Sequence, residues 1–276
     1  MSDPSAPLLD ELVRDLRRSP ILVVTGAGIS LASGIPTFRG TDPGAIWSVD
    51  VTKLGTRAYF ERDPAGSWAW YLKRFGGLEG KEPNPAHHAL VALEQLSAAA
   101  GREYLLVTQN VDTLHEMAGS KAMVKVHGTV DRVRCSRGGC QNGSPSGSLP
   151  RSVFDTTAFL QNPVEANVPR CPACGSFLRQ HVLWFDEYYT EHADYQFTRA
   201  QRAMQSCAVV LFVGTSFAVG LTDNVLSMCA GRVPVWSIDP SGRAPDKRVR
   251  MLTGKAEELL PEVVAKLARE ASAPSS

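Results

Sequence analysis

The stretch ILVVTGAGISLASGIPTFRG, residues 21–40, decides which fold the chain can adopt. Its first four residues are apolar and mostly β-branched, which is typical of a buried strand. They run directly into the turn Thr25-Gly26-Ala27-Gly28. Glycines permit backbone angles closed to other residues and let a ligand touch the main chain, while N–H groups at the start of a short following helix can face an anion. Gly34 and Pro36 are expected to end that helix.

The loop that follows, Thr37-Phe38-Arg39-Gly40, extends the same candidate site. Arg39 can clamp a phosphate, and Phe38 can cover a planar ring. The G-x-G-x-x-G fingerprint is incomplete, because Leu31 stands where the third glycine is expected. A strand, turn and helix that bind no ligand fit these residues as well, so this stretch alone leaves a nucleotide site undecided.

Composition points to an ordinary globular protein with one large domain, or one domain with a subsidiary lobe. The chain has 276 residues, of which 43% are hydrophobic and 21% charged. The net charge of +1 argues against a broad nucleic-acid or membrane-binding surface. The polar start MSDPSAPLLDELVRDLRRS is neither a signal peptide nor a membrane span, so we expect a cytoplasmic protein. Its six cysteines are then metal ligands or packed thiols rather than disulfides.

Periodic apolar residues predict strands that alternate with helices. The strands are expected at 21–24, 104–107, 123–126, 208–213 and 233–238, and the helices at 8–16, 68–75, 85–101, 194–205, 223–230 and 256–269. Such alternation predicts an α/β fold with a Rossmann-type, doubly wound parallel sheet. The polar, poorly patterned residues 141–170 are expected to form an excursion outside the core.

Ligands of doubly wound sheets bind beyond the carboxyl ends of the strands, and five polar segments occur there. They are expected to converge on one crevice: Gly26 to Gly28, Gln109-Asn110 with Asp112, His127, Gly214-Thr215-Ser216, and Asp239. Asp239 can accept hydrogen bonds from ribose hydroxyls and would repel a 2′-phosphate, which favours NAD over NADP. It can equally be a turn residue before Pro240.

His127 is a candidate general base, because its imidazole has an unperturbed pKa of about 6.5 and follows a predicted strand. The alternative is a solvent-facing strand end. We interpret His87, His88, His115, His181 and His192 as structural.

Two cysteine pairs predict a closed zinc site. Cys171 and Cys174 have the two-residue gap of a metal knuckle, and Cys135 and Cys140 are separated by four residues. Four thiolates complete a tetrahedron without an open position, so the zinc would be structural. A redox-active or disulfide role is the alternative. Cys207 and Cys229 lie in apolar contexts and are expected to pack in the core.

The chain resembles the sirtuins, which are NAD-dependent protein lysine deacylases. The resemblance is carried by motifs that occur in this order: GAGIS, GIPTFRG, TQNVDTLH, KVHG, the two cysteine pairs, VLWFDE and GTS. The resemblance covers about residues 19–264. It implies a single catalytic domain with a large Rossmann-type lobe, residues 8–41, 84–130 and 178–270. A small lobe would comprise a helical insertion, residues 42–83, and a zinc module, residues 131–177. Substrates would be acyl-lysine proteins or peptides, bound between the lobes.

The resemblance also implies roles for individual residues. His127 would be the catalytic base, assisted by Asn110, and Val182, Trp184 and Phe185 would bind the substrate. NAD would be bound by Gly26, Ala27, Gly28, Thr37, Phe38, Arg39, Gln109, Asn110, Asp112, Gly214, Thr215, Ser216, Asp239 and Ala256. In the family's chemistry the acyl oxygen attacks the ribose as nicotinamide leaves. The histidine then helps a ribose hydroxyl attack the imidate, which yields free lysine and O-acyl-ADP-ribose.

One motif resembles the desuccinylase and demalonylase branch. Tyr71 and Arg74 match its Tyr-x-x-Arg signature and lie three residues apart, so both can face the carboxylate of succinyl- or malonyl-lysine. Gly55 would leave room for the longer acyl group. The alternative places Tyr71 in an aromatic helix stripe with Trp68 and Phe75, and makes Arg74 a solvated helix-end cation.

The chain departs from the family pattern where the substrate backbone is expected to pair. Gln180 replaces a proline and Asp186 a glycine. Gly220-Leu221 follows GTS in place of the usual proline, Asp239 replaces asparagine, and the first cysteine pair is wider than usual. These departures motivate two alternatives to a deacylase: an ADP-ribosyltransferase or NAD hydrolase, and a non-enzymatic NAD-sensing module.

Overall fold

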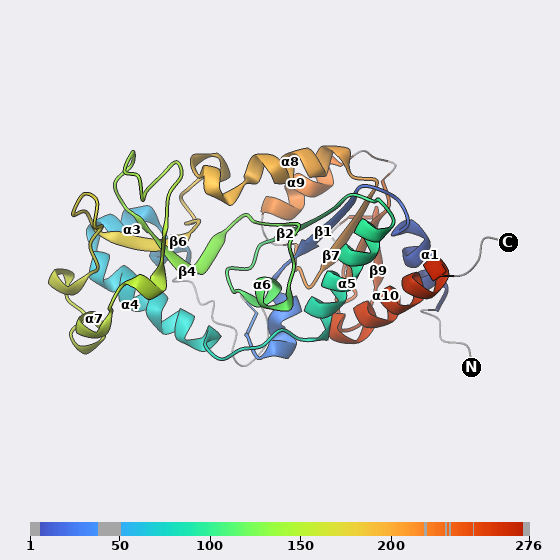
Figure 1. Cartoon of the computed structure of the whole chain (residues 1–276), viewed down its shortest axis with the longest axis horizontal. Coiled ribbons are helices and arrows are strands. Elements are labelled where there is room, and N and C mark those ends of the chain that lie inside the picture. The colour runs from blue at the N-terminus through green and yellow to red at the C-terminus, as the bar shows by residue number, and fades with distance from the viewer. Residues whose placement is uncertain are drawn as a thin grey trace.

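A six-stranded parallel sheet forms the centre of the protein (Figure 1). The computed structural model describes residues 6–37, 51–217, 220–229, 231, 233–244 and 246–272. The strand order is β3-β2-β1-β7-β8-β9, with the bounds β1 (Ile21–Thr25), β2 (Tyr104–Thr108), β3 (Met123–Lys125), β7 (Val209–Val213), β8 (Val235–Ile238) and β9 (Val249–Leu252). Thr25 is in register with Thr108 and Val213, so these carboxyl ends lie side by side.

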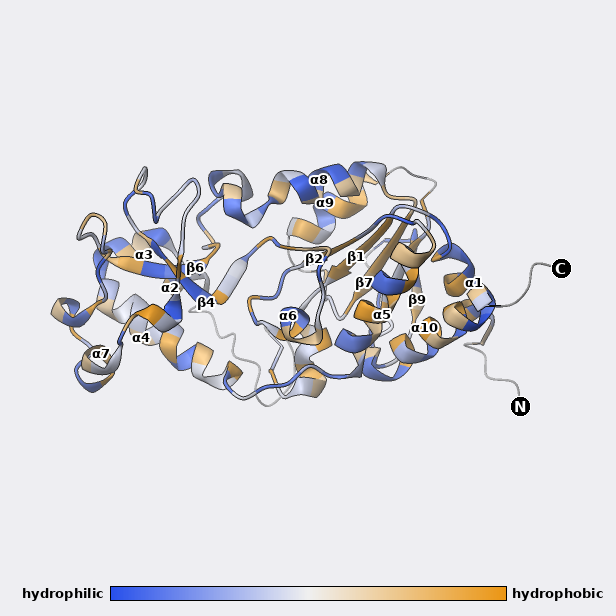
Figure 2. Cartoon of the chain, in the orientation of Figure 1, coloured by the Kyte–Doolittle hydropathy of each residue, from blue (hydrophilic) through white to orange (hydrophobic). Residues whose placement is uncertain are grey.

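Helices cover both faces of this sheet, as the alternation of elements predicts. Ile21 and Val23 pack in the core beneath α1 (Ala6–Asp15), α5 (Pro85–Ala99) and α10 (Ala256–Ser272). Leu22 and Val24 pack in the core beneath α8 (Phe197–Ser206) and α9 (Gly220–Met228). All residues of β1 are buried because both of its faces are covered, and the central strands of the sheet are predominantly hydrophobic (Figure 2). The predicted α/β fold class is confirmed.

A smaller unit lies at the far end of the molecule from α1 and α10 (Figure 1). Its antiparallel sheet has the order β5-β4-β6, formed by β5 (Leu149–Pro150), β4 (Gly128–Cys135) and β6 (Leu178–Val182). Beside it lie α2 (Val51–Leu54), α3 (Arg57–Arg62), α4 (Pro64–Phe75) and α7 (Thr157–Gln161). Because β6 pairs with β4, we propose that residues 178–182 belong to this smaller unit and that the large lobe resumes after them.

The expectation that residues 141–170 lie outside the core is wrong in part. Phe159 of α7 and Val168 are buried in the core of the smaller unit, with Trp68, Tyr71 and Phe75 of α4. Trp68 meets the ring of Phe159 edge-on at 6.1 Å between centroids, and its indole N–H donates to the Leu178 carbonyl. Two apolar residues widely spaced in a polar stretch give no periodic signal, although they complete the core of the smaller unit.

Short helices connect the main elements. They are α6 (Leu114–Ala118) and the 3₁₀ helices Ala27–Ser33, Gly76–Leu78, Arg151–Val153, Glu165–Asn167, Tyr189–Glu191 and Ala193–Tyr195. The helix expected from residue 194 begins only at Phe197, because Gln196 has a φ of 51°, which interrupts the helical path. None of the described helices is both long and apolar enough to cross a membrane.

Candidate active site

The turns after β1 and β7 meet in backbone contact at the carboxyl edge of the sheet. The N–H of Gly26 donates to the Val213 carbonyl, and the N–H of Gly28 donates to the Gly214 carbonyl at 2.8 Å. These two N–H groups therefore bind protein, not an anion, and Gly26 has an ordinary φ of −126°. The expectation of unusual backbone angles is wrong for Gly26. Glycine is needed because a Cβ on Gly28 would lie 2.8 Å from Gly214 Cα.

The amide of Asn110 joins this turn to the segment after β2. Its Nδ2 donates to the Gly26 carbonyl and to Ser30 Oγ, both at 3.2 Å. Ser30 in turn donates to Asp112 Oδ2 at 3.0 Å, and Asp112 Oδ1 accepts the Leu114 N–H. Burial raises the pKa of Asp112, while these hydrogen bonds favour its ionised form. The Oδ1 atom of Asn110 is buried and has no hydrogen-bond partner among the described residues, so it offers an acceptor to a ligand.

Gln109 spans the same edge. Its side-chain amide lies 3.4 Å from the Thr25 carbonyl and from Thr215 Oγ1, and its own N–H donates to the Thr25 carbonyl. Thr215 is buried, whereas Ser216 is exposed. The structure therefore brings together the glycine turn, the Gln-Asn-Asp segment and the Gly214 turn. Thr37 lies within the described part of the chain, and Phe38 and Arg39 lie outside it.

His127 lies where the chain leaves the large sheet for the smaller one. Its Nδ1 is 2.8 Å from the Gln109 carbonyl oxygen, and its Nε2 is 3.0 Å from the Tyr189 hydroxyl. A carbonyl only accepts, so Nδ1 carries the proton and Nε2 keeps the basic lone pair. Burial lowers the pKa of His127, and the hydrogen bond to Gln109 opposes this shift. The imidazole is thus held neutral at pH 7, as a general base requires.

Two predicted residues occupy mainly structural positions. Asp239 follows β8 and accepts the Ser241 N–H at 2.8 Å, which is the turn role considered as the alternative. This contact uses one carboxylate oxygen of Asp239, Oδ1. Ala256 is buried in the core at the start of α10, so only its main chain is suited to contact a ligand.

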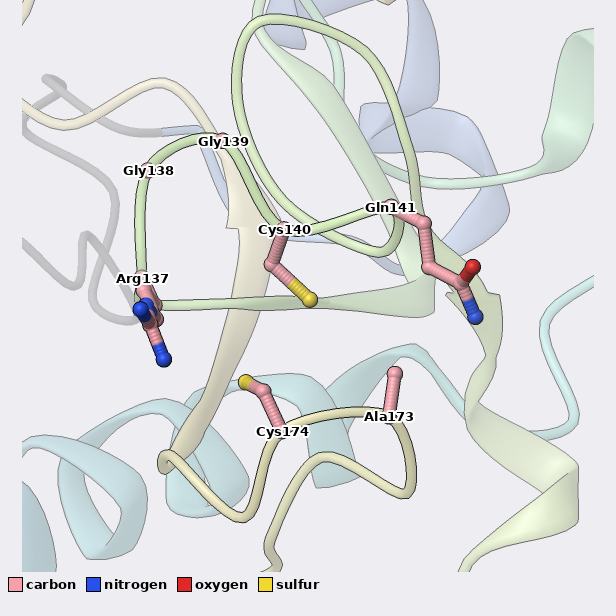
Figure 3. Close-up of a pocket in the computed structure, with 7 residues that line it drawn as sticks. All are labelled: Arg137, Gly138, Gly139, Cys140, Gln141, Ala173 and Cys174. Carbon is pink, nitrogen blue, oxygen red and sulfur yellow. The ribbon is translucent and has the colours of Figure 1, made fainter.

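The four predicted zinc cysteines form one cluster in the smaller unit. The sulfur atoms of Cys135, Cys140, Cys171 and Cys174 all lie within 4.8 Å of one another. Cys135 is 3.4 Å from Cys174, and Cys140 is 3.8 Å from Cys171. Figure 3 shows the side chains of Cys140 and Cys174 extending from two facing loops into the space between them, beside a pocket. Four converging thiols fit a tetrahedral zinc ion.

On α4 the ring of Trp70 contacts both Tyr71 and Arg74. The Trp70 ring meets Tyr71 edge-on, with 4.6 Å between centroids, and the Arg74 guanidinium lies 4.0 Å from the Trp70 centroid. Burial raises the pKa of Tyr71, so its hydroxyl is neutral, and Arg74 is half-buried. Tyr71 therefore belongs to the aromatic stripe, but Arg74 is held against a ring rather than simply solvated.

The expected substrate-binding segment is tied to the Gly55 loop. The Phe185 N–H donates to the Gly55 carbonyl at 3.0 Å, and the Asp186 carboxylate accepts the N–H groups of Arg57 and Ala58 at the start of α3. Val182 and Trp184 are buried, while Phe185 is 52% exposed. The side chain that replaces glycine at position 186 thus points to a helix terminus, where a carboxylate is favourable.

Comparisons with known proteins agree with this geometry. Residues 26–220 match the model of the Sir2 family. The chain belongs to the Sir2 family. An NAD-dependent protein deacylase of Pyrococcus furiosus is 37% identical over 267 residues, which are 95% of this chain and 99% of the relative. NAD-dependent protein deacylase 1 of Pseudomonas aeruginosa is 38% identical and covers 92% of this chain and 96% of its own length.

Solved structures of Sir2 proteins superpose on nearly the whole chain. A complex of a mutant Sir2 homologue with ADP-ribose has a TM-score of 0.80 at 31% identity and covers 97% of this chain and 99% of its own. A complex of a Sir2 homologue with NAD has a TM-score of 0.76 at 31% identity and covers 95% of each chain. The resemblance to sirtuins and the dependence on NAD, both predicted from the sequence, are confirmed at the level of the Sir2 family.

The residues of this Sir2 protein fit a dinucleotide. The buried Asn110 Oδ1 supplies an unused acceptor at the carboxyl edge of the sheet. It lies next in the chain to Gln109, whose carbonyl accepts from His127. Sequence reasoning missed Ser30, which joins Asn110 to Asp112, and Tyr189, which contacts His127. The GAGIS motif contains Ser30 and could have identified it, whereas no pattern in the sequence marks Tyr189.

Proposed function

We propose that this Sir2-family protein is an NAD-dependent lysine deacylase that prefers acyl groups ending in a carboxylate, such as succinyl and malonyl. The deacylase class is that of its nearly full-length relatives. The acyl preference goes further and is supported by one observation. On α4, beside the substrate-binding segment, Arg74 is fixed against Trp70, and Trp70 packs against Tyr71.

The position of Arg74 suits an acidic acyl group. Stacking on Trp70 restrains a flexible side chain before the ligand arrives, which lowers the entropic cost of binding. The half-buried position strengthens an ion pair relative to one in bulk water, and burial lowers the pKa of the guanidinium without neutralising it. The neutral Tyr71 hydroxyl can add a hydrogen bond. An acetyl group offers no carboxylate to either residue.

The remaining residues of the site have separable roles. When bound, NAD supplies the ribose carbon that receives the acyl oxygen as nicotinamide departs. We assign nicotinamide and ribose recognition to Gln109, Asn110 and Asp112, because their polar groups converge at the sheet edge. His127 Nε2 takes a proton from a ribose hydroxyl, and Trp184 and Phe185 help exclude water from the cleft.

The test compares Arg74→Met with Arg62→Met. Arg62 of α3 also stacks on a tyrosine, with its guanidinium 5.4 Å from the Tyr59 centroid, so it is a matched cation outside the acyl site. We expect Arg74→Met to lower kcat/KM for succinyl- and malonyl-lysine peptides at least tenfold while changing acetyl-lysine turnover less than threefold. Arg62→Met should change neither. Equal losses on all three acyl groups would show that Arg74 does not recognise the carboxylate.

The same reactions separate the other candidate activities. Mass spectrometry should identify O-acyl-ADP-ribose and unmodified lysine. Free ADP-ribose, or ADP-ribose attached to protein, would support the alternative enzyme classes, and a lack of turnover would support an NAD sensor. The Asp186 carboxylate binds the N–H groups at the start of α3. Its replacement of glycine is therefore no reason to expect that peptide binding is blocked. We further propose that the enzyme works in the cytoplasm, where four free thiols remain available to zinc.

A further inference from the structure

The two ring nitrogens of His127 have different partners. The Gln109 carbonyl holds Nδ1, and the Tyr189 hydroxyl lies 3.0 Å from Nε2, the nitrogen that must act as the base. In the neutral ring, Nε2 has only a lone pair, so the tyrosine hydroxyl is the donor. A residue outside every motif of the sequence thus contacts the reactive atom of the site.

Packing fixes Tyr189 in this position. Its ring lies nearly parallel to that of Phe197, with 4.3 Å between centroids and 13° between planes. It also lies nearly parallel to the His127 ring, at 5.7 Å and 19°. Burial raises the pKa of Tyr189 to about 12, so the phenol stays neutral at the pH at which a histidine base works. Tyr189 therefore presents an uncharged hydroxyl from a rigid ring.

A hydroxyl can serve both protonation states of an imidazole. It donates to the lone pair of the neutral ring, and after rotation of its proton it accepts from the N–H of the imidazolium. Hydrogen bonds to a charged partner are roughly twice as strong as neutral ones, so the charged ring gains more from this contact. We infer that Tyr189 is a positioning residue for His127. Its hydroxyl orients the neutral base, releases the Nε2 lone pair to the ribose hydroxyl when NAD is bound, and then accepts from the imidazolium formed when Nε2 takes that proton.

Nearby charged side chains are engaged elsewhere. Asp112 accepts from Ser30 and Leu114, and Lys125 donates to Glu116 and to the Asp112 carbonyl. On the tyrosine's own segment Glu191 pairs with Arg57, and on α8 the Arg199 guanidinium lies 3.4 Å from the Met123 carbonyl. Within the part of the chain that the structure describes, Tyr189 is the titratable side chain hydrogen-bonded to the His127 ring.

The decisive experiment measures the ionisation of His127 directly. The full-length zinc-loaded protein, labelled with ¹⁵N-histidine, is titrated by NMR, and His127→Ala identifies the resonance. We expect Tyr189→Phe to keep the ring stack but lower the His127 midpoint by about half a unit to one unit. Tyr188→Phe is the matched control, because this neighbouring tyrosine is 74% exposed and should leave the midpoint unchanged.

An unchanged or raised midpoint in Tyr189→Phe would overturn the inference, since a raised value would mean that the hydroxyl mainly stabilises the neutral ring. The inference rests on His127 as the proposed base, but the titration needs neither NAD nor turnover. A shifted midpoint in an inactive protein would therefore refute the proposed function alone.

Kinetics then tests whether this contact serves the reaction. In the sequence of steps expected for the family, nicotinamide leaves before the base acts. We therefore expect Tyr189→Phe to slow formation of free lysine about three- to tenfold and to leave exchange of labelled nicotinamide into NAD unchanged. Equal slowing of both would contradict a role through His127, because it would indicate a disturbed cleft.

Discussion

At the scale of single residues, Gly28 lies so close to the turn at Gly214 that no side chain fits between them. A Cβ would lie 2.8 Å from both the Cα and the carbonyl oxygen of Gly214, and these backbone atoms cannot move aside. We expect Gly28→Ala to lower the free energy of unfolding by about 2 kcal/mol or more. Urea unfolding followed by fluorescence measures this change.

Gly76→Ala is the control for this substitution. Gly76 follows α4 with a right-handed helical conformation, and a Cβ at this position would have no neighbour within 4 Å among the described residues. Alanine should there be neutral or stabilising by up to about 1 kcal/mol. Similar destabilisation at both positions would mean that the contact between the two turns is unimportant.

Ser30 connects two residues that we assign to NAD recognition, Asn110 and Asp112. Its buried hydroxyl accepts from Asn110 and donates to Asp112. In Ser30→Ala, one carboxylate oxygen is left buried without its donor, which costs about 1–3 kcal/mol. We expect kcat/KM for NAD to fall roughly tenfold or more, measured by initial rates at saturating acyl-peptide.

Ser33→Ala serves as the comparison, because Ser33 belongs to the same 3₁₀ helix but accepts from Asn84, away from Asn110 and Asp112. This variant should keep kcat/KM for NAD within about threefold of the unmodified protein. A loss as large as that of Ser30→Ala would assign the effect to the helix as a whole.

At the scale of elements, hydropathy predicts the strands that are covered on both faces. Residues 21–24 are continuously apolar because helices pack on both faces of β1, so their sequence contains the full signal. Leu178–Val182 was not predicted because its sequence, LRQHV, is polar, although every residue is buried. Arg179 can be buried because it makes two hydrogen bonds to Glu187, eight residues further along the chain, and neither helical nor strand periodicity displays this pairing.

The candidate site divides in the same way. Motifs at strand ends predicted Gln109, Asn110 and His127, since the carboxyl ends of parallel strands must share one edge. Tyr189 comes from a 3₁₀ helix after the smaller sheet, and its approach to His127 depends on how that segment packs against Phe197. Such a contact is set by tertiary packing, so it could not be predicted from spacing.

The four-cysteine cluster allows a prediction about the stability of the smaller unit. The cysteine cluster ties β4, which ends at Cys135, to the knuckle at Cys171 and Cys174, and structural zinc contributes on the order of 10 kcal/mol to such modules. We expect about one zinc per chain in the unmodified protein and little in Cys171→Ser. Elemental analysis and limited proteolysis measure this, with new cleavage expected within residues 131–182.

Cys229→Ser is the matched control, because Cys229 is buried in a core beside the large sheet and is not part of the four-cysteine cluster. It should retain zinc and its resistance to cleavage. Full zinc in Cys171→Ser, or a folded smaller unit after chelation, would show that the metal does not hold this unit together.

At the scale of the whole molecule, His127 lies at the crossing between the two sheets. It follows β3 of the large sheet and precedes β4 of the smaller one, and its carbonyl accepts the Leu183 N–H just after β6. Val130 donates to the Val111 carbonyl across the same junction. The proposed base is thus positioned by the connection between the two sheets, so a change in their relative position would also move the imidazole against Gln109 and Asn110.

Two buried histidines, His87 on α5 and His115 on α6, make the stability of the fold sensitive to acid. The rings of His87 and His115 lie 4.8 Å apart, and His115 contacts Thr25 of β1. Burial lowers the pKa of His87 to about 4 and that of His115 well below its ordinary value. The unfolded chain, with histidine pKa values of about 6.5, therefore binds protons that the folded chain does not, and unfolding becomes easier as the pH falls below 6.5.

Each histidine contributes a slope of up to about 1.4 kcal/mol per pH unit. The contribution of His87 is fully present above pH 6.5 and is lost progressively as the pH falls toward 4. The test is to measure the free energy of unfolding in urea at pH 7.5, 6 and 5. In His87→Gln its dependence on pH should be weaker by the contribution of about one proton. The unmodified protein is the reference, because a change at the neighbouring His88, which itself lowers the pKa of His87, would disturb the same titration. Since acid weakens zinc binding equally in both proteins, the difference between them isolates His87. Equal slopes would show that this imidazole becomes protonated in the folded protein as readily as in water.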